Sequence, residues 1–186
     1  MAEIITARTG TAHVTPAQDA SWHRGTFGLP TCVIDDPTLE GFSTEIRNNN
    51  EVWVRSGIAQ NQGRFWWVPV NTYDSLQVEN GAQGMNRIDR AVMRFTVDQE
   101  NNTQSCSWVV IQGTPTAGTP TAPAYTQGDL DNDGLVSDMP MFLIELEGIN
   151  LTSVIAEYEV ALTTEAARIS QETIQMFEGA GYPITD

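Results

Sequence analysis

Acidic side chains alternate along one short stretch of the chain in the way that calcium-binding loops require. The stretch contains Asp129, Asp131 and Asp133, followed by Gly134. Three alternating carboxylates can converge on one cation, and a glycine permits the sharp turn that brings them together. The twelfth position, where a glutamate normally completes the coordination shell, is Pro140, and Asp138 could replace only part of its role. The sequence leaves open a calcium site formed by these four aspartates, although we favour an acidic, solvated turn without a metal.

An aromatic run offers a second kind of chemistry. In the stretch from Arg64 to Val70, Trp66 and Trp67 are adjacent, so in a β-strand their side chains point to opposite faces. We expect one of them to lie in the core and the other to be exposed or to contact another protein. The alternative is a platform of exposed tryptophans that stacks on sugar rings.

Charged residues on a third segment are spaced for pairing. On a strand, Arg87 and Asp89 share one face, and Arg90 and Arg94 share the other. We interpret them as an ion-pair ladder within one subunit or between subunits. Catalysis by Asp89 would require a cleft and a raised pKa, and the sequence indicates neither.

The two histidines, His13 and His23, have no catalytic partners at recognisable spacing. The sequence contains no nucleophile motif, no zinc-protease motif and no phosphate-binding glycine loop. A wall-degrading hydrolase with a carboxylate pair such as Asp35 and Asp36 is the enzymatic alternative, but nothing around this pair supports it. We therefore expect a protein that is not an enzyme.

Composition narrows the range of partners. The 186 residues include 24 acidic and 9 basic residues, all of the latter arginine, and the formal net charge is −15. Phosphate backbones and anionic lipids repel such a chain, so we expect neither nucleic acid nor a membrane as partner. Cys32 and Cys106 are expected to be buried free thiols, with a disulfide between them as the alternative. The N-terminus lacks a basic region followed by an apolar run, so we expect no signal peptide.

Turn residues divide most of the chain into short β-prone runs, at the spacing of about 8–12 residues that is typical of all-β proteins. The runs span residues 3–6, 12–15, 31–35, 43–47, 51–55, 64–70, 75–79, 87–97, 105–112, 141–147 and 152–162. They predict an all-β domain over residues 1–162, similar to a β-sandwich or jelly roll. A Pro/Thr/Ala segment that follows residue 112 can be neither a helix nor a central strand.

Only the C-terminal region is predicted to be helical. Thr163 is a suitable N-cap, and Gly179 ends a helix that spans residues 163–178. Ile169 and Phe177 share one face of this helix, which could pack on its own sheet or against copies of itself around an axis. Residues 163–186 are therefore predicted to form a helix and a tail.

Several short motifs, taken together and in their order along the chain, resemble a structural module of bacteriophages. Residues 86–89 read Asn-Arg-Ile-Asp before an alternating strand, and residues 110–115 read Val-Ile-Gln-Gly-Thr-Pro. Together with residues 11–28 and 142–150, they resemble tail and baseplate proteins of phages that infect Gram-positive bacteria.

The resemblance implies a β-rich domain that docks a fibre, baseplate or head appendage onto the virion, often as a trimer, after assembly in the host cytoplasm. Its partners would be copies of itself and other virion structural proteins. Longer relatives continue into a coiled coil and a receptor-binding tip, so an adaptor or small appendage fits this chain better. The alternatives are a carbohydrate-binding module that contacts a host cell-wall glycan, and a capsid or head-fibre protein. The candidate interface residues are Trp66, Trp67, Arg87, Asp89, Ile169 and Phe177.

Overall fold

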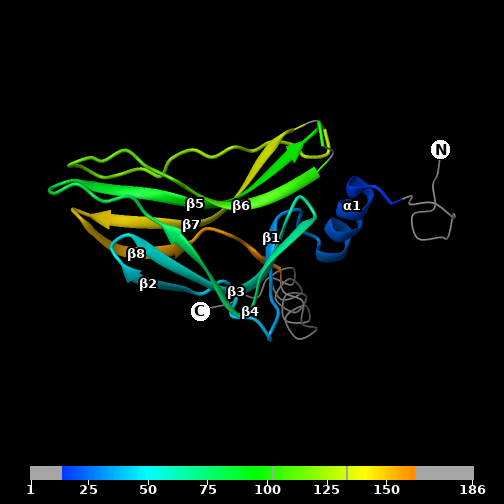
Figure 1. Ribbon diagram of the computed structural model, residues 1–186, viewed down its shortest axis with the longest axis horizontal. Helices are drawn as coiled ribbons and strands as arrows, with labels where there is room; N and C mark the ends of the chain where they lie inside the picture. Colours follow the sequence, from blue (N-terminus) through cyan, green and yellow to red (C-terminus); the bar gives the residue numbers. More distant parts are fainter. Residues whose placement is uncertain (1–13, 102, 133, 162–186) are drawn as a thin grey trace, which may run out of the picture.

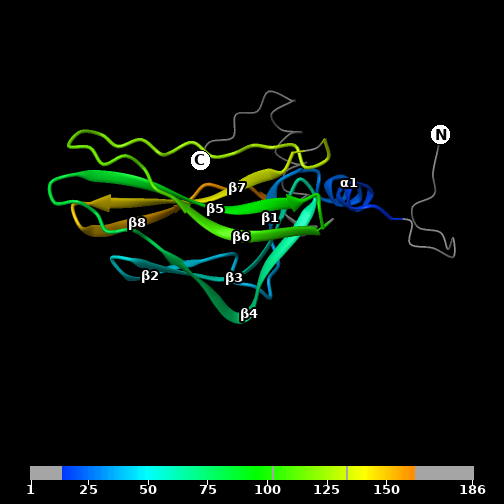
Figure 2. The same ribbon diagram turned by 45° about the horizontal axis from the view of Figure 1, so that its top comes forward.

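The computed structural model describes residues 14–101, 103–132 and 134–161, which form two β-sheets and one N-terminal α-helix. Figures 1 and 2 show the sheets one above the other, with the helix α1 at one end of the molecule. The prediction of a mostly β protein is confirmed. The predicted strand at residues 3–6 and the predicted helix at residues 163–178 lie outside the described residues.

The five-stranded sheet is built around one long central strand, β3. On one side β3 pairs with β4 along its whole length. On the other side, the first half of β3 pairs with β2 and the second half pairs with β1. All of these pairs are antiparallel, whereas β9 adds to β1 in parallel. The strands are β1 (Cys32–Ile34), β2 (Thr44–Asn48), β3 (Glu51–Asn61), β4 (Arg64–Gln77) and β9 (Val160–Ala161).

The four-stranded sheet is antiparallel throughout, in the order β6-β5-β7-β8. Two hairpins, β5–β6 and β7–β8, meet along β5 and β7. The strands are β5 (Asn86–Asp98), β6 (Thr103–Ile111), β7 (Val136–Glu147) and β8 (Asn150–Ala156).

One main hydrophobic core takes side chains from both sheets, so the two sheets are held together by burial of apolar surface. Val54 and Leu76 enter it from the five-stranded sheet, and Ala91 and Ile144 enter it from the four-stranded sheet. Buried residues alternate with outward-facing ones along much of these strands, as the two-residue period of a β-strand requires.

Helix α1 (Pro16–Phe27) was not predicted from the sequence. The side chain of Thr15 accepts a hydrogen bond from the backbone N–H of Gln18, and the Gln18 side chain accepts one from the backbone N–H of Thr15, which together form a capping box. Pro16 at the first helical position adds a favourable φ. The predicted strand at residues 12–15 is therefore wrong at Val14 and Thr15, because these residues lead into a helix; residues 12 and 13 lie outside the described part.

Strand β4 joins two runs that were predicted separately, residues 64–70 and 75–79. Val68 pairs with Gly57, but the next pair joins Tyr73 to Arg55, so four residues of β4 bulge out of the sheet. Asn71 within this bulge has a φ of 59°, which asparagine tolerates better than most residues. The continuous strand could not be predicted because the bulge interrupts its alternation.

Strand β7 begins at Val136, five residues earlier than predicted, and includes Pro140. A register shift falls between Ala91 and Val92 of β5, at the level of Pro140 and Phe142. Proline is tolerated in a strand at such an irregularity. The predicted strand at residues 152–162 is divided, because the chain leaves β8 at Ala156 and crosses to the other sheet before β9.

The Pro/Thr/Ala segment at residues 112–127 forms neither helix nor strand, as predicted. It first hydrogen-bonds to the start of β5, where Asn86 and Thr116 exchange two backbone bonds. It then returns to β7, where Thr126 and Asp138 are joined by two hydrogen bonds. Figures 1 and 2 show this segment running along the outer side of the four-stranded sheet.

Candidate functional site

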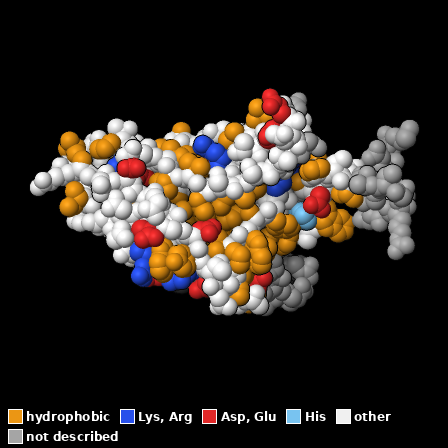
Figure 3. Space-filling model, in the orientation of Figure 1, with side chains coloured by type: hydrophobic (Ala, Val, Ile, Leu, Met, Phe, Trp, Pro, Cys, Tyr) orange, Lys and Arg blue, Asp and Glu red, His pale blue; other side chains and the backbone are white. Residues whose placement is uncertain are grey.

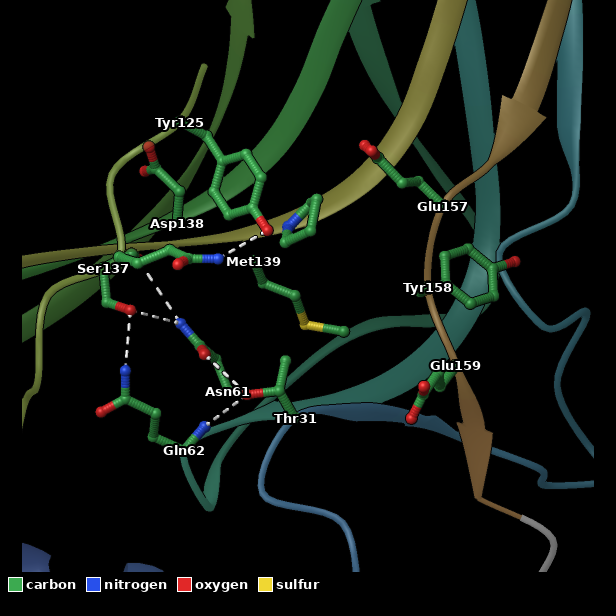
Figure 4. A pocket seen from close by; sticks show the side chains of 12 residues that line it. Thr31, Asn61, Gln62, Tyr125, Ser137, Asp138, Met139, Glu157, Tyr158 and Glu159 are labelled. Atoms are coloured by element: carbon green, nitrogen blue, oxygen red, sulfur yellow. Dashed lines mark hydrogen bonds between the residues drawn. The ribbon is translucent and has the colours of Figure 1, made fainter.

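A pocket of about 310 Å³ lies where the chain crosses from β8 to β9. Figure 4 shows Glu157, Tyr158 and Glu159 of the crossing segment on one side, and Tyr125 and Ser137 on the other. β8 pairs with β7 only from Phe142 onwards, so the first residues of β7 are not covered by β8, and Ser137, Asp138 and Met139 line the pocket.

Most polar side chains that line this pocket already form hydrogen bonds with other groups of the protein. The amides of Asn61 and Gln62 both donate hydrogen bonds to the hydroxyl oxygen of Ser137, over 3.3 and 2.9 Å. On the opposite wall Glu157 accepts two hydrogen bonds from Arg90, both of 2.8 Å. No histidine or cysteine is among the described lining residues, so they contain no nucleophile with an imidazole base. The pocket offers hydroxyls, amides and carboxylates to a bound molecule.

In the candidate calcium loop, Asp131 is paired with two arginines. Its carboxylate forms ion pairs with Arg24 over 2.9 Å and with Arg64 over 2.8 Å. Asp129 accepts hydrogen bonds from the side chain of Asn132 and the backbone N–H of Asp131. These bonds lower the pKa of Asp129, with the Asn132 side chain as the largest cause.

Asp138 points away from this loop, into the outer side of the four-stranded sheet. Arg94 binds both of its oxygens, over 2.7 and 2.8 Å, and the backbone N–H of Thr126 donates a third bond. Burial alone would raise the pKa of Asp138, but the bonds from Arg94 and Thr126 outweigh it, so the pKa is lowered.

Metal-ligating side chains therefore do not converge in the described part of this loop. Among the residues that the structure describes, no group of three or more His, Cys, Asp or Glu side chains could hold a metal ion. Asp133 lies outside those residues. The geometry of the described residues agrees with the acidic turn that the sequence favours, and the calcium site stays the untested alternative.

The adjacent tryptophans face opposite ways, as predicted. Trp66 is 5% exposed, stacks on Phe42 at a centroid distance of 4.7 Å and meets Trp108 edge-on at 5.3 Å. Trp67 is 60% exposed on the outer face of β4. Phe65, two residues earlier on the same face, is also exposed. Figure 3 shows hydrophobic side chains gathered on the side of the molecule where β4 and β6 lie.

A second aromatic pair, the half-buried Trp53 and the exposed Tyr73, lies on the five-stranded sheet and was not predicted. The rings of Trp53 and Tyr73 stack at 3.8 Å, and the guanidinium of Arg47 lies 4.1 Å from the centre of the Trp53 ring. The pair depends on the register shift in β4, which aligns Tyr73 with Arg55. The sequence shows which residues of each strand share a face, but it does not show the register between β3 and β4 that brings Trp53 and Tyr73 together.

Arg87 and Asp89 form an ion pair in the interior of the chain. The side chains are 3% and 1% exposed, and the shortest distance between them is 2.8 Å. Asp89 also accepts the backbone N–H of Gly113, and Arg87 donates to the backbone carbonyl oxygens of Glu79 and Asn80. The pair therefore joins β5 to two loops of its own chain and presents no side chain to a partner.

All arginines in the described part of the chain are paired with acidic side chains. Each of its seven arginines forms an ion pair with an aspartate or glutamate of the same chain. The remaining two of the nine, Arg8 and Arg168, lie outside the described residues, as do the candidate interface residues Ile169 and Phe177. The surface charge that is left over is acidic.

The contacts of His23 connect helix α1 to the five-stranded sheet. One of its ring nitrogens lies 2.8 Å from the carbonyl oxygen of Gly63, and its ring packs against Phe65 with a centroid distance of 4.2 Å. It therefore anchors α1 to β4. His13 lies outside the described residues.

A scan of protein-family models finds no match to this sequence, and a search of curated proteins finds no similar sequence. In the described residues, α1 is too short and too polar to span a membrane.

Proposed function

We propose that this chain is a structural protein of a bacteriophage particle, an adaptor or small appendage of the tail, baseplate or fibre that acts by assembling with other subunits. The proposal takes up the resemblance of the motifs at residues 86–89 and 110–115, and it regards the two-sheet domain as a sandwich-like docking block. A role in a capsid or head fibre is the same proposal with a different place in the particle.

The observation that carries the proposal is the exposed apolar face of β4. Trp67, Val70 and Tyr73 are 60%, 45% and 45% exposed, and Phe65 extends the row at 39%. Large exposed apolar side chains in a group are typical of surfaces that contact other proteins. The buried Arg87–Asp89 pair and the shared core make this face part of a stiff block.

Copies of the chain are proposed to form homo-oligomers, with a trimer favoured by the resemblance and by the predicted helix at residues 163–178. The acidic surface would keep unassembled subunits soluble in the host cytoplasm until they dock. The mechanism is assembly, and it needs no catalytic residue.

The test is the composition of purified particles. Peptide mass spectrometry of particles banded in a density gradient should find this chain at a fixed copy number relative to the major capsid protein. Replacing Trp67 by serine should lower that copy number, whereas replacing Trp22, which is equally exposed on α1, should not. A chain found only in the soluble fraction would refute the proposal.

A second candidate function, recognition of a cell-wall glycan, is favoured by the pocket at the β8–β9 crossing. Two tyrosines, Tyr125 and Tyr158, line it together with amides and the carboxylate of Glu159, which is the set of groups that binds sugar units through stacking and hydrogen bonds. Wall polysaccharide should then change the tyrosine and tryptophan fluorescence of the protein, and Tyr125→Ala should abolish that change. An unchanged spectrum at saturating polysaccharide would exclude this function.

A further inference from the structure

Strand β6 is an edge strand with a free side. Among the described residues its backbone pairs only with β5. The nine pairs run from Arg90 opposite Ile111 to Asp98 opposite Thr103, without a register shift. The other side of β6 therefore presents an uninterrupted row of backbone N–H and C=O groups, at the edge of the sheet seen in Figure 2.

The other edge strands of the described part each carry a feature that hinders the addition of a further strand. β4 contains Pro69 and the bulge at Asn71, and β2 carries Glu45 and Arg47 and a register shift. β8 also has a register shift, and β9 has only two residues. Such features keep sheet edges from pairing with other chains. β6 contains no proline, no charged residue and no bulge.

The side chains of β6 would permit the close approach of a strand. The first five, Thr103–Ser107, are all exposed, and none is charged or aromatic. A groove of about 480 Å³ runs beside them, lined by Trp67 of β4 and Trp108 of β6 among others. A chain that paired with β6 would also cover apolar surface in this groove.

The charge distribution indicates which chain can pair there. Because every described arginine is engaged within its own chain, none is free to neutralise an acidic group of a second copy. Contact between two copies at a charged surface would therefore bring like charges together in a protein of net charge −15. Physiological salt largely screens charges that are more than about 8 Å apart, so like charges in closer contact still repel each other. β6 itself carries no charged side chain, so two copies can pair there without a like-charge pair between the two paired strands. The acidic residue Asp74 lines the adjacent groove, where it accepts a hydrogen bond from the indole N–H of Trp108.

We propose that two copies of this chain pair through β6, antiparallel about a two-fold axis, so that their four-stranded sheets join into one continuous sheet. The proposal rests on the assembly function above and names its contact. A two-fold contact is self-complementary, so the residue nearest the axis faces its own copy. Facing Cα atoms in an antiparallel pair are about 4.5–5.5 Å apart, which is within the range that a disulfide can span.

Cysteine cross-linking tests this geometry in the full-length protein. Cys106 is an exposed free thiol on β6, whereas Cys32 is buried and remains as an internal control. Single cysteines at positions 104, 105 and 107 in a Cys106→Ser background would complete a scan with the natural Cys106. Under mild oxidation, one position should form disulfide-linked dimers at least about 10-fold faster than Gln77→Cys, an exposed position of β4 that does not line the groove, with the yield falling on either side of it. Rates equal to that of Gln77→Cys at all positions would overturn the proposal.

Sedimentation equilibrium gives a second, independent readout. Up to about 10⁻⁴ M, a range suited to a small interface, the wild type should reach two copies, or six if residues 163–178 also form a trimer. The double variant Ser105→Glu/Ser107→Glu should lose the two-fold step because it places like charges at the seam, whereas Gln77→Glu on β4 should retain it. A wild type of only one or three copies would overturn the seam.

The two proposals fail in different ways. A chain that is present in particles but never cross-links through β6 would retain its structural role and lose the proposed seam. A chain that cross-links through β6 but is absent from particles would retain the seam and lose the virion role.

Discussion

Replacing Asp89 by asparagine tests how much the buried ion pair contributes to the stiffness of the domain. The substitution keeps the shape of the side chain but leaves the Arg87 guanidinium charged and 3% exposed, without its counter-charge. It also weakens the acceptor of the Gly113 backbone N–H. Removing one partner of a buried pair costs about 3–5 kcal/mol. For a chain of this length that corresponds to a fall in Tm of roughly 6–20 °C.

The assay is equilibrium unfolding in urea, followed by tryptophan fluorescence and by circular dichroism at the same protein concentration. The matched control is Glu45→Gln, because Glu45 pairs with Arg47 and Arg55 at the surface and exposed pairs contribute little. An Asp89→Asn protein within about 1 kcal/mol of the wild type would refute the reasoning that an unpaired buried guanidinium is costly.

Three further outcomes are expected from the same unfolding assay. Trp66→Ala should cost about 3–5 kcal/mol because it empties a core position, whereas Trp67→Ala should change stability little; equal losses would contradict their opposite placement. The pKa of Asp138 is lowered in the folded state, so its contribution is present above the pKa of a free aspartate, about 3.9, and is lost as pH falls through the lower folded value. Asp138→Asn should therefore remove part of the acid-induced loss of stability below about pH 4 and leave Arg94 unpaired at neutral pH; an unchanged pH profile would contradict this. Millimolar calcium should leave the unfolding midpoint unchanged if residues 129–138 form a solvated turn, and a clear rise would restore the calcium site.

Local alternation was enough to predict much of the sheet. The opposite placement of Trp66 and Trp67 and the shared face of Arg87 and Asp89 both follow from the two-residue period of a strand. The period does not predict how deeply a side chain is buried, because the same pattern fits an ion-pair ladder at the surface. The contacts that enclose Arg87 and Asp89 come from the loops at residues 79–80 and 113.

Helix α1 was predictable and was missed. Thr15, Pro16 and Gln18 form a complete helix-start signal, but this signal overlaps the β-prone run at residues 12–15. The helix has little apolar periodicity, and of its residues only Ala20 is buried, so the usual amphipathic pattern was not there to indicate it.

Register and long-range contacts could not be predicted from the sequence. The Trp53–Tyr73 stack requires the bulge in β4, and the pairing of Arg24 and Arg64 with Asp131 requires α1, β4 and the acidic loop to meet. These arginines lie 107 and 67 positions from the aspartate in the sequence, and no local pattern links them. The loop resembles a calcium site in sequence, but in the structure Arg24 and Arg64 neutralise Asp131 within the chain.

The most direct test of the proposed role is to remove the chain from the particle. A stop codon at Trp22 in the phage genome, propagated on a suppressing host and then grown once on a non-suppressing host, should yield particles that lack a discrete piece of tail, baseplate, fibre or head appendage in electron micrographs, and fewer infectious units. Particles of unchanged appearance and full infectivity from the non-suppressing host would contradict the account.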